Sequence, residues 1–246
     1  MKVCITESRA ELGIKAAGDI AEAIRRGLQE KPQLRVVFAA APSQGEMLAA
    51  LRCEAGIDWR RVHAFHMDEY IGLDQGMPQR FGNWLRRAFF DHVPLGSVQL
   101  IEPGSDPDAE CMRYASLLAE GPIDLVLLGI GANGHLAFND PPADLNDPVM
   151  VKVVVLDEVC RQQQVSDGCF GSLTEVPETA ITVTVPTLLS GQELYCCVPG
   201  RLKASAVRAV LKSPISGLCP ATALRTHPRC TLYLDAESSS MITDHE

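Results

Sequence analysis

The chain has 246 residues, of which 46% are hydrophobic, and its 22 Lys and Arg against 31 Asp and Glu give a formal net charge of -9. A chain of this length can bury a substantial core, and we expect residues 1–246 to form a single domain with a frayed tail from about residue 237. Neither sign of charge forms a long block, which argues against a nucleic-acid or membrane partner. A small molecule is the expected ligand.

The cysteines and the N-terminus indicate the compartment. The nine cysteines are odd in number and widely spread, without the spacing of a metal or redox motif. We therefore expect reduced core thiols and no metal site. The N-terminus becomes acidic at Glu7, before an apolar core of signal-peptide length, and no later stretch is long enough to span a membrane. These features predict a cytoplasmic protein.

Strand and helix patterns alternate along the chain. In chain order we predict a helix over 9–30, a buried strand over 34–40, a short helix over 46–51, a strand over 62–67, helices over 81–92 and 109–118, and a nearly continuous apolar strand over 123–130. Further strands follow at 150–155, 180–185, 193–198 and 230–234, with helices at 202–211 and 221–226. Strands separated by helices predict an α/β fold with a mostly parallel sheet covered on both faces.

The stretch GIGANGH, residues 129–135, follows the strand at 123–130 and fits the glycine pattern G-x-G-x-x-G. In a dinucleotide-binding fold, this pattern opens directly into a helix that faces the pyrophosphate. Pro141 and Pro142 follow within a few residues and exclude a crossover helix of normal length. We therefore favour a catalytic loop over a nucleotide site.

In that catalytic loop, Gly131 and Gly134 bend the chain and His135 reaches the carboxyl-end crevice where open α/β sheets hold ligands. Asn133 and Asp140 bracket His135, and either could hold the imidazole in one tautomer. A histidine with such neighbours is a candidate for acid/base catalysis.

A second polar stretch, Asp68-Glu69-Tyr70, follows the strand at 62–67 and could place Asp68 in the same crevice. The adjacent charge of Glu69 would raise the pKa of Asp68, which suits a carboxylate that moves protons from carbon. A solvated acidic turn explains these residues equally well when they are taken alone.

At these two loops the sequence resembles the glucosamine-6-phosphate deaminase family, a branch of a group that includes 6-phosphogluconolactonases. The resemblance is carried by FHMDEYIGL at residues 65–73 and LGIGANGHLAFNDP at residues 128–141. Weaker matches occur in the family's order at residues 89–93, 182–189, 200–204 and 227–228. Together they run through nearly the whole chain.

The resemblance implies a Rossmann-like three-layer α/β/α domain that converts an amino-sugar phosphate to a ketose phosphate and ammonia, without metal or cofactor. Asp68 would match the base that moves a proton between C2 and C1, and His135 the residue that opens the sugar ring. Asn133 and Asp140 stand where the family usually has aspartate and glutamate. An amide fixes geometry without supplying charge. Because Asp140 is one methylene shorter than glutamate, we expect it to reach the ring only after a backbone shift or through a water.

The phosphate site departs further from the family. The loop AAPSQG, residues 40–45, replaces a glycine- and threonine-rich loop, and Ser43 with Glu46 also fits a helix capping box. The family's phosphate-binding arginine falls on Gln164, one helical turn from Arg161 as a substitute. Lys203 matches the phosphate-binding lysine. We expect substrate contacts from seven residues: Ser43, Gln44, Glu69, Gly131, Gly134, Arg161 and Lys203.

Three other interpretations stay open at this stage. The group resemblance also allows a 6-phosphogluconolactonase-type hydrolase, although the residues around Asp68 and Asp140 favour the deaminase branch. Altered phosphate loops could leave a sugar-phosphate sensor without turnover, or an enzyme for a different sugar phosphate. The sequence does not fix the oligomeric state, and a homo-oligomer is compatible with it.

Overall fold

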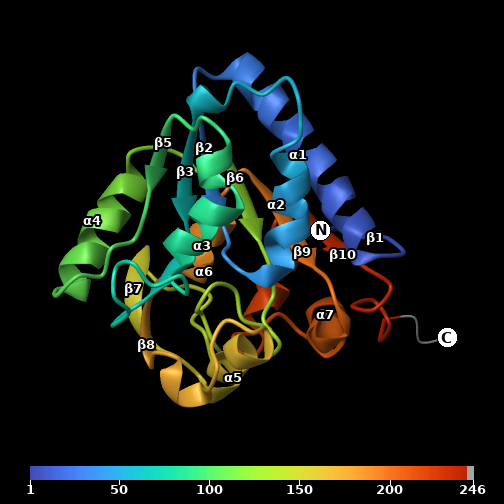
Figure 1. The fold of residues 1–246 in the computed structure, drawn as a ribbon. Coiled ribbons are helices and arrows are strands. Elements are labelled where there is room, and N and C mark those ends of the chain that lie inside the picture. Colours follow the sequence, from blue (N-terminus) through green and yellow to red (C-terminus); the bar gives the residue numbers. More distant parts are fainter. Residues whose placement is uncertain (243–246) are drawn as a thin grey trace.

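The computed structural model describes residues 1–242, and its centre is a seven-stranded parallel sheet (Figure 1). The strands lie in the order β1-β10-β9-β6-β2-β3-β5, and every neighbouring pair is parallel. Their bounds are β1 Lys2–Ile5, β2 Leu34–Phe38, β3 Val62–His66, β5 Ser97–Gln99, β6 Leu125–Leu128, β9 Glu193–Val198 and β10 Cys230–Leu234. The predicted mostly parallel α/β sheet is confirmed.

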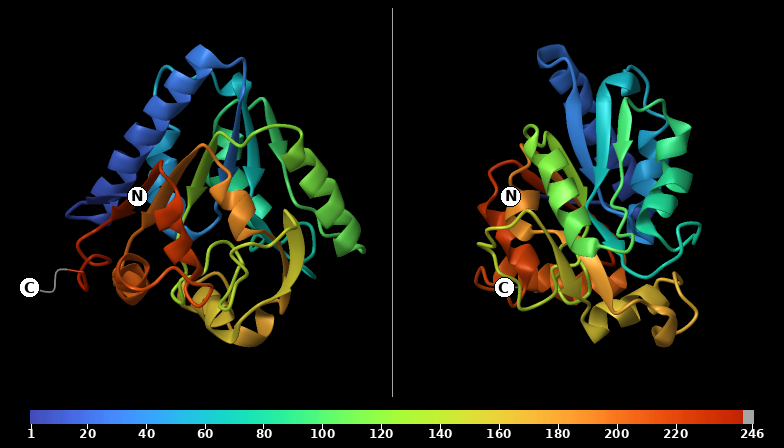
Figure 2. Two further views of the ribbon diagram at one scale, coloured as in Figure 1. Left: turned by 180° about the vertical axis from the view of Figure 1, so that it is seen from behind. Right: turned by 90° about the vertical axis from the view of Figure 1, so that its left-hand side faces the viewer.

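Helices cover both faces of this sheet, which makes the three-layer arrangement (Figure 2). One face packs against α1 (Arg9–Glu30), α2 (Gly45–Leu51) and α3 (Phe81–Ala88), and the other against α4 (Pro107–Ala119), α6 (Val185–Leu189) and α7 (Ala204–Lys212). In β6, Leu125 and Leu127 join the first core and Val126 and Leu128 the second. A strand buried on both faces needs this continuous apolar run, because successive side chains point to opposite sides.

A second, three-stranded antiparallel sheet lies beyond the carboxyl ends of the parallel strands (Figure 1). It contains β4 (Asp68–Tyr70), β8 (Thr179–Val183) and β7 (Val151–Val155), in that order. In the register of β4 with β8, Asp68 stands opposite Thr182. The helix α5 (Glu158–Ser166) follows β7, and Asp157 caps it by accepting the Val159 N–H at 2.6 Å.

The predicted elements are present, with shifts of a few residues at their ends. Sequence patterns missed β1, β4, β5, α5 and α6. The predicted helix over 81–92 divides into α3 and the 3-10 helix Phe90–His92, and the helix over 221–226 is a 3-10 helix, Pro220–Thr226. The strands predicted at 150–155 and 180–185 belong to the antiparallel sheet and not to the parallel one.

The predicted fraying of the tail from residue 237 is wrong for residues 237–242, which form a turn. Ser238 is fully buried there and its N–H donates to Asp235 at 2.7 Å. The rest of that prediction, residues 243–246, lies outside the described residues. Among residues 1–242, no helix is long and apolar enough to cross a membrane.

Candidate active site

The cavity with the predicted catalytic residues opens where the strand order reverses. From β2 the chain proceeds outward to β3 and β5, then returns to β6 on the other side of β2 and continues to β9 and β10. The segments that follow β2 and β6, including Ala39–Ala41 and Gly129–Gly131, line a cavity of about 480 Å³, counting the part open to solvent. Ligands of open α/β folds bind at such a switch point.

Asp68 and His135 both line this cavity, although 67 positions separate them in the chain. Asp68 is the first residue of β4 and is only 5% exposed. Burial, and secondarily the charge of Glu69, raises the pKa of Asp68 well above its usual value. Within residues 1–242 its carboxylate has no hydrogen-bond or ion-pair partner, so it is free to meet a substrate. The solvated-turn interpretation of this stretch is therefore wrong.

Several backbone hydrogen bonds hold the loop that carries His135. The Gly134 N–H donates to Gly131 O and the Gly131 N–H donates to His135 O, each at 3.0 Å, which closes the tight bend. The Phe138 N–H donates to Thr182 Oγ1 at 3.1 Å, which ties the loop to β8. Ala137, at the cavity wall, adopts a left-handed backbone with φ of 50°. The loop therefore has one defined conformation set by β8.

Asp140 lies directly behind the imidazole. His135 Nδ1 is 3.0 Å from Asp140 Oδ1, although this nitrogen lacks the alignment of a good hydrogen bond. The other carboxylate oxygen accepts the Asp157 N–H at 3.0 Å. Burial would raise the pKa of Asp140, but the contacts with His135, Asn133 and Asp157 outweigh burial and lower it. Asp140 is therefore a carboxylate at neutral pH.

Asp140 contacts the ring directly at 3.0 Å, so the expected bridging water is not needed. Asn133 also acts differently from a ring partner. Its Oδ1 accepts the backbone N–H of His135 and its Nδ2 donates to Asp140 Oδ1, both at 3.1 Å. Asn133 thus orients the carboxylate and the loop, and Asp140 supplies the charge beside the imidazole.

The ring of His135 packs over Gly131. A Cβ atom at Gly131 would lie 2.2 Å from both Cε1 and Nε2 of the ring, so only glycine permits this placement. Gly134 has a different role. It adopts φ of 85°, and its carbonyl accepts the Ala221 N–H at 2.9 Å, away from the cavity wall. The structure therefore gives Gly131 a place in the site and Gly134 a place in the bend.

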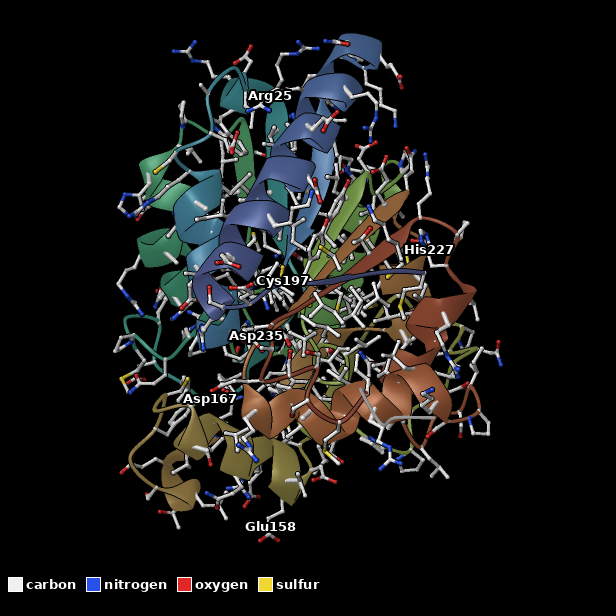
Figure 3. The ribbon with its side chains drawn as sticks, turned by 90° about the vertical axis from the view of Figure 1, so that its right-hand side faces the viewer. Arg25, Glu158, Asp167, Cys197, His227 and Asp235 are labelled. Atoms are coloured by element: carbon white, nitrogen blue, oxygen red, sulfur yellow. The ribbon has the colours of Figure 1, made fainter. Side chains whose placement is uncertain are left out.

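Lys203 supplies a buried positive charge to the same cavity. It is 7% exposed, and its ammonium has no hydrogen-bond or ion-pair partner among residues 1–242. Desolvation lowers its pKa from 10.5 to about 8, and Asp167, labelled in Figure 3, offsets that effect only in part. A cation buried without a counter-charge favours an anionic ligand.

Two of the predicted substrate-binding residues lie elsewhere. The carboxylate of Glu69 is fully buried and accepts the N–H groups of Phe81 and Gly82 at the start of α3, each at 3.0 Å. Arg161 Nη2 donates to the carbonyls of Leu173 and Val176 at 2.9 Å, on a different surface hollow from the catalytic cavity. Glu69 thus positions α3, and Arg161 holds the segment after α5.

Ser43 and Gln44 do line the cavity, as expected. The capping box predicted for Ser43 is wrong, because a 3-10 helix already begins at Pro42 and the Glu46 carboxylate pairs with Arg9 at 2.6 Å. Instead, Ser43 Oγ accepts from Gln44 Nε2 at 3.2 Å. The Ser43 hydroxyl proton is thereby left free for a ligand.

The cavity also contains residues that were not among the seven expected substrate contacts. Gln163 and Gln164 enter it from α5, and Gln163 Oε1 accepts the Ala132 N–H of the histidine loop at 2.7 Å. The polar run of α5 gave no apolar period that could have located this helix. Apolar walls come from Met67, Ala137, Phe138 and Phe81, and the latter two rings stack at 5.4 Å.

Comparisons with known proteins show the family of this chain. A family model described as glucosamine-6-phosphate isomerases/6-phosphogluconolactonase matches residues 7–232. Glucosamine-6-phosphate deaminase of Pseudarthrobacter chlorophenolicus is 32% identical over 251 positions, which cover 98% of this chain and 93% of the relative. That of Thermoanaerobacter pseudethanolicus is 31% identical and covers 100% and 97%.

Solved structures of the same two kinds of enzyme resemble this chain. A monomeric glucosamine-6-phosphate deaminase superposes with a TM-score of 0.89 at 31% identity, covering 98% of this chain and 100% of that one. A 6-phosphogluconolactonase of Thermotoga maritima has a TM-score of 0.77 at 19% identity over 95% and 99%, which shows a shared fold alone. The chain therefore belongs to the family of glucosamine-6-phosphate isomerases and 6-phosphogluconolactonases.

Proposed function

We propose that this enzyme converts glucosamine 6-phosphate, or a closely related hexosamine phosphate, to a ketose phosphate and ammonia. The observation that carries the proposal is the presence of Asp68, His135 and Lys203 around one cavity. The three groups match the three demands of the reaction, which are a base for a carbon-bound hydrogen, an acid/base at the ring oxygen and a cation for the phosphate.

In the proposed reaction His135, backed by the Asp140 carboxylate, first transfers a proton to the ring oxygen and opens the pyranose. The Asp140 carboxylate stabilises the imidazolium form of His135, which carries the proton that is transferred. Asp68 then removes the hydrogen from C2 and returns it to C1, while a proton from the amine passes to O1. C1 is thereby left as a hydroxymethyl group and C2 as an imine. Water adds to that imine and ammonia departs, so the products are the ketose phosphate and ammonia.

The site's charges support these assignments. Asp68 is desolvated, and a base of raised pKa is a stronger proton acceptor near neutral pH than an ordinary carboxylate. Lys203, assisted by the Ser43 hydroxyl, would hold the phosphate. Gln164 stands in the cavity where the family's arginine falls, and its amide would donate to a phosphate oxygen without adding charge.

The test is release of ammonia and ketose phosphate from glucosamine 6-phosphate by the purified protein, with 6-phosphogluconolactone as the competing substrate. Replacing Asp68 by Asn removes the base and should lower kcat about 100-fold to 10,000-fold. Replacing His135 by Gln should have a smaller effect, because sugar rings also open slowly in water. Hydrolysis of the lactone without turnover of any hexosamine phosphate would overturn the proposal.

A further inference from the structure

We propose that a thiophilic divalent cation, Zn²⁺ in the first instance, binds between His135, Asp140 and Cys160 and thereby switches the enzyme off. One ring nitrogen of His135, a carboxylate oxygen of Asp140 and the thiol sulfur of Cys160 lie within 4.8 Å of one another. Nδ1 is the ring nitrogen beside Asp140, at 3.0 Å from Oδ1. His135 and Asp140 belong to one loop, but Cys160 follows 20 positions after Asp140, so the set lacks the cysteine and histidine spacings that reveal most metal sites.

The donor set is the kind that zinc prefers. Nitrogen, oxygen and sulfur donors hold zinc at about 2.0 to 2.3 Å, and a site with three protein donors keeps a fourth position for water or a ligand. Donors around such an ion are about 3.5 Å apart. The 3.0 Å separation between His135 Nδ1 and Asp140 Oδ1 must therefore widen by about 0.5 Å, and a pair at the 4.8 Å limit must close by about 1.3 Å.

A second observation comes from the imidazole. His135 is only 8% exposed, and its Nδ1 lacks an aligned hydrogen-bond partner. Nδ1 therefore lies beside the Asp140 carboxylate without a well-aligned hydrogen bond and is available to bind an ion. His135 is also the member of the cluster that lines the catalytic cavity, so an ion would reach the cluster from the cavity, past this ring.

Binding needs one proton to leave. Asp140 is already a carboxylate, and the neutral imidazole can offer Nδ1 while its proton sits on Nε2. The Cys160 thiol must ionise as the sulfur–zinc bond forms, and its proton goes to solvent. The two negative donors then balance the charge of the ion, which allows the complex to remain buried.

The inhibition rests on the proposed function, whereas the binding does not. Zinc would neutralise Asp140 and occupy Nδ1, so Nε2 would carry a proton that it could no longer exchange at the ring oxygen. Ring opening would stop, and chelation by EDTA would restore it.

Binding is tested first with Co²⁺, a spectroscopic substitute for zinc, on the whole chain. We expect a sulfur-to-cobalt charge-transfer band at one ion per chain, which Zn²⁺ abolishes by displacement. Cys160→Ser should remove the band and weaken Zn²⁺ binding about tenfold or more, because the hydroxyl is a poor ligand for a soft ion. Cys53→Ser and Cys169→Ser, an exposed and a half-buried thiol outside the cluster, should retain both.

A zinc-soaked crystal gives a readout that does not depend on the variant's folding. An anomalous peak between the three donor atoms is expected. A peak at other residues, or a cobalt–sulfur band that survives Cys160→Ser in folded protein, would overturn the proposal. If the unmodified, metal-free protein has no deaminase activity, the proposed function is refuted, but the proposed metal site is not.

Discussion

Replacing Lys203 by Met tests whether the buried ammonium of Lys203 destabilises the free protein and binds phosphate. A lysine whose pKa falls from 10.5 to about 8 on folding is less favourable in its charged form by about 3 kcal/mol. Methionine keeps a similar length without the charge. The Lys203→Met variant should therefore be more stable than the parent by up to about 3 kcal/mol at pH 7, when no ligand is bound.

The difference in unfolding free energy between Lys203→Met and the parent should depend on pH. Below pH 8 the lysine is charged in both the folded and the unfolded chain, and the whole penalty is present. As the pH rises from about 8 to 10.5, the folded chain loses its proton first, so the penalty shrinks and vanishes above that window. The stability gap between the two proteins should close over the same range.

Urea unfolding at pH 7 and pH 10, with and without inorganic phosphate, measures both effects. Phosphate should stabilise the parent by mass action and leave Lys203→Met unmoved. The variant should lose about 10-fold to 150-fold in kcat/KM, because a charged hydrogen bond contributes about 1.5–3 kcal/mol. Lys212→Met, at an exposed position in α7, is the matched control. A variant less stable than the parent at pH 7, with an undiminished response to phosphate, would refute the reasoning.

Three further changes address the catalytic groups. Gly131→Ala should push the His135 ring aside and lower kcat about 100-fold while the urea midpoint changes little, and a crystal structure with an unmoved ring would contradict this. Asp140→Asn should lower kcat by a similar factor and reduce the unfolding free energy by about 1 kcal/mol, measured by urea titration, because the acceptor of a partly buried N–H loses its charge. Glu69→Gln should move the acid limb of the kcat/KM profile to lower pH, since a neutral neighbour lowers the pKa of Asp68; an unmoved limb would exclude that coupling.

The sequence predicted those elements whose apolar residues follow a clear period. The strand at β6 and the helix α1 could be located because burial on both faces, or along one stripe, leaves a pattern in the chain. The strand β4 could not be located, since two of its three residues, Asp68 and Glu69, are acidic and give no apolar alternation. Local propensity was overridden there by pairing with β8.

Site residues divide in the same way. His135 and Asp68 were predicted because each follows a strand that could be recognised, and strand ends converge at one edge of a parallel sheet. Arg161 was misplaced because a spacing of one helical turn does not reveal which face of α5 meets the cavity. The direct reach of Asp140 also depended on three-dimensional context, since the start of α5 brings Asp157 and Cys160 to the same carboxylate.

The small antiparallel sheet connects the two halves of the chemistry. Asp68 stands opposite Thr182, and the Thr182 hydroxyl oxygen accepts the N–H that anchors the histidine loop. The pair of Asp68 and Thr182 therefore positions both the base and the loop that carries the imidazole. A change at Thr182 would therefore alter the spacing between Asp68 and His135, although this side chain need never touch the sugar.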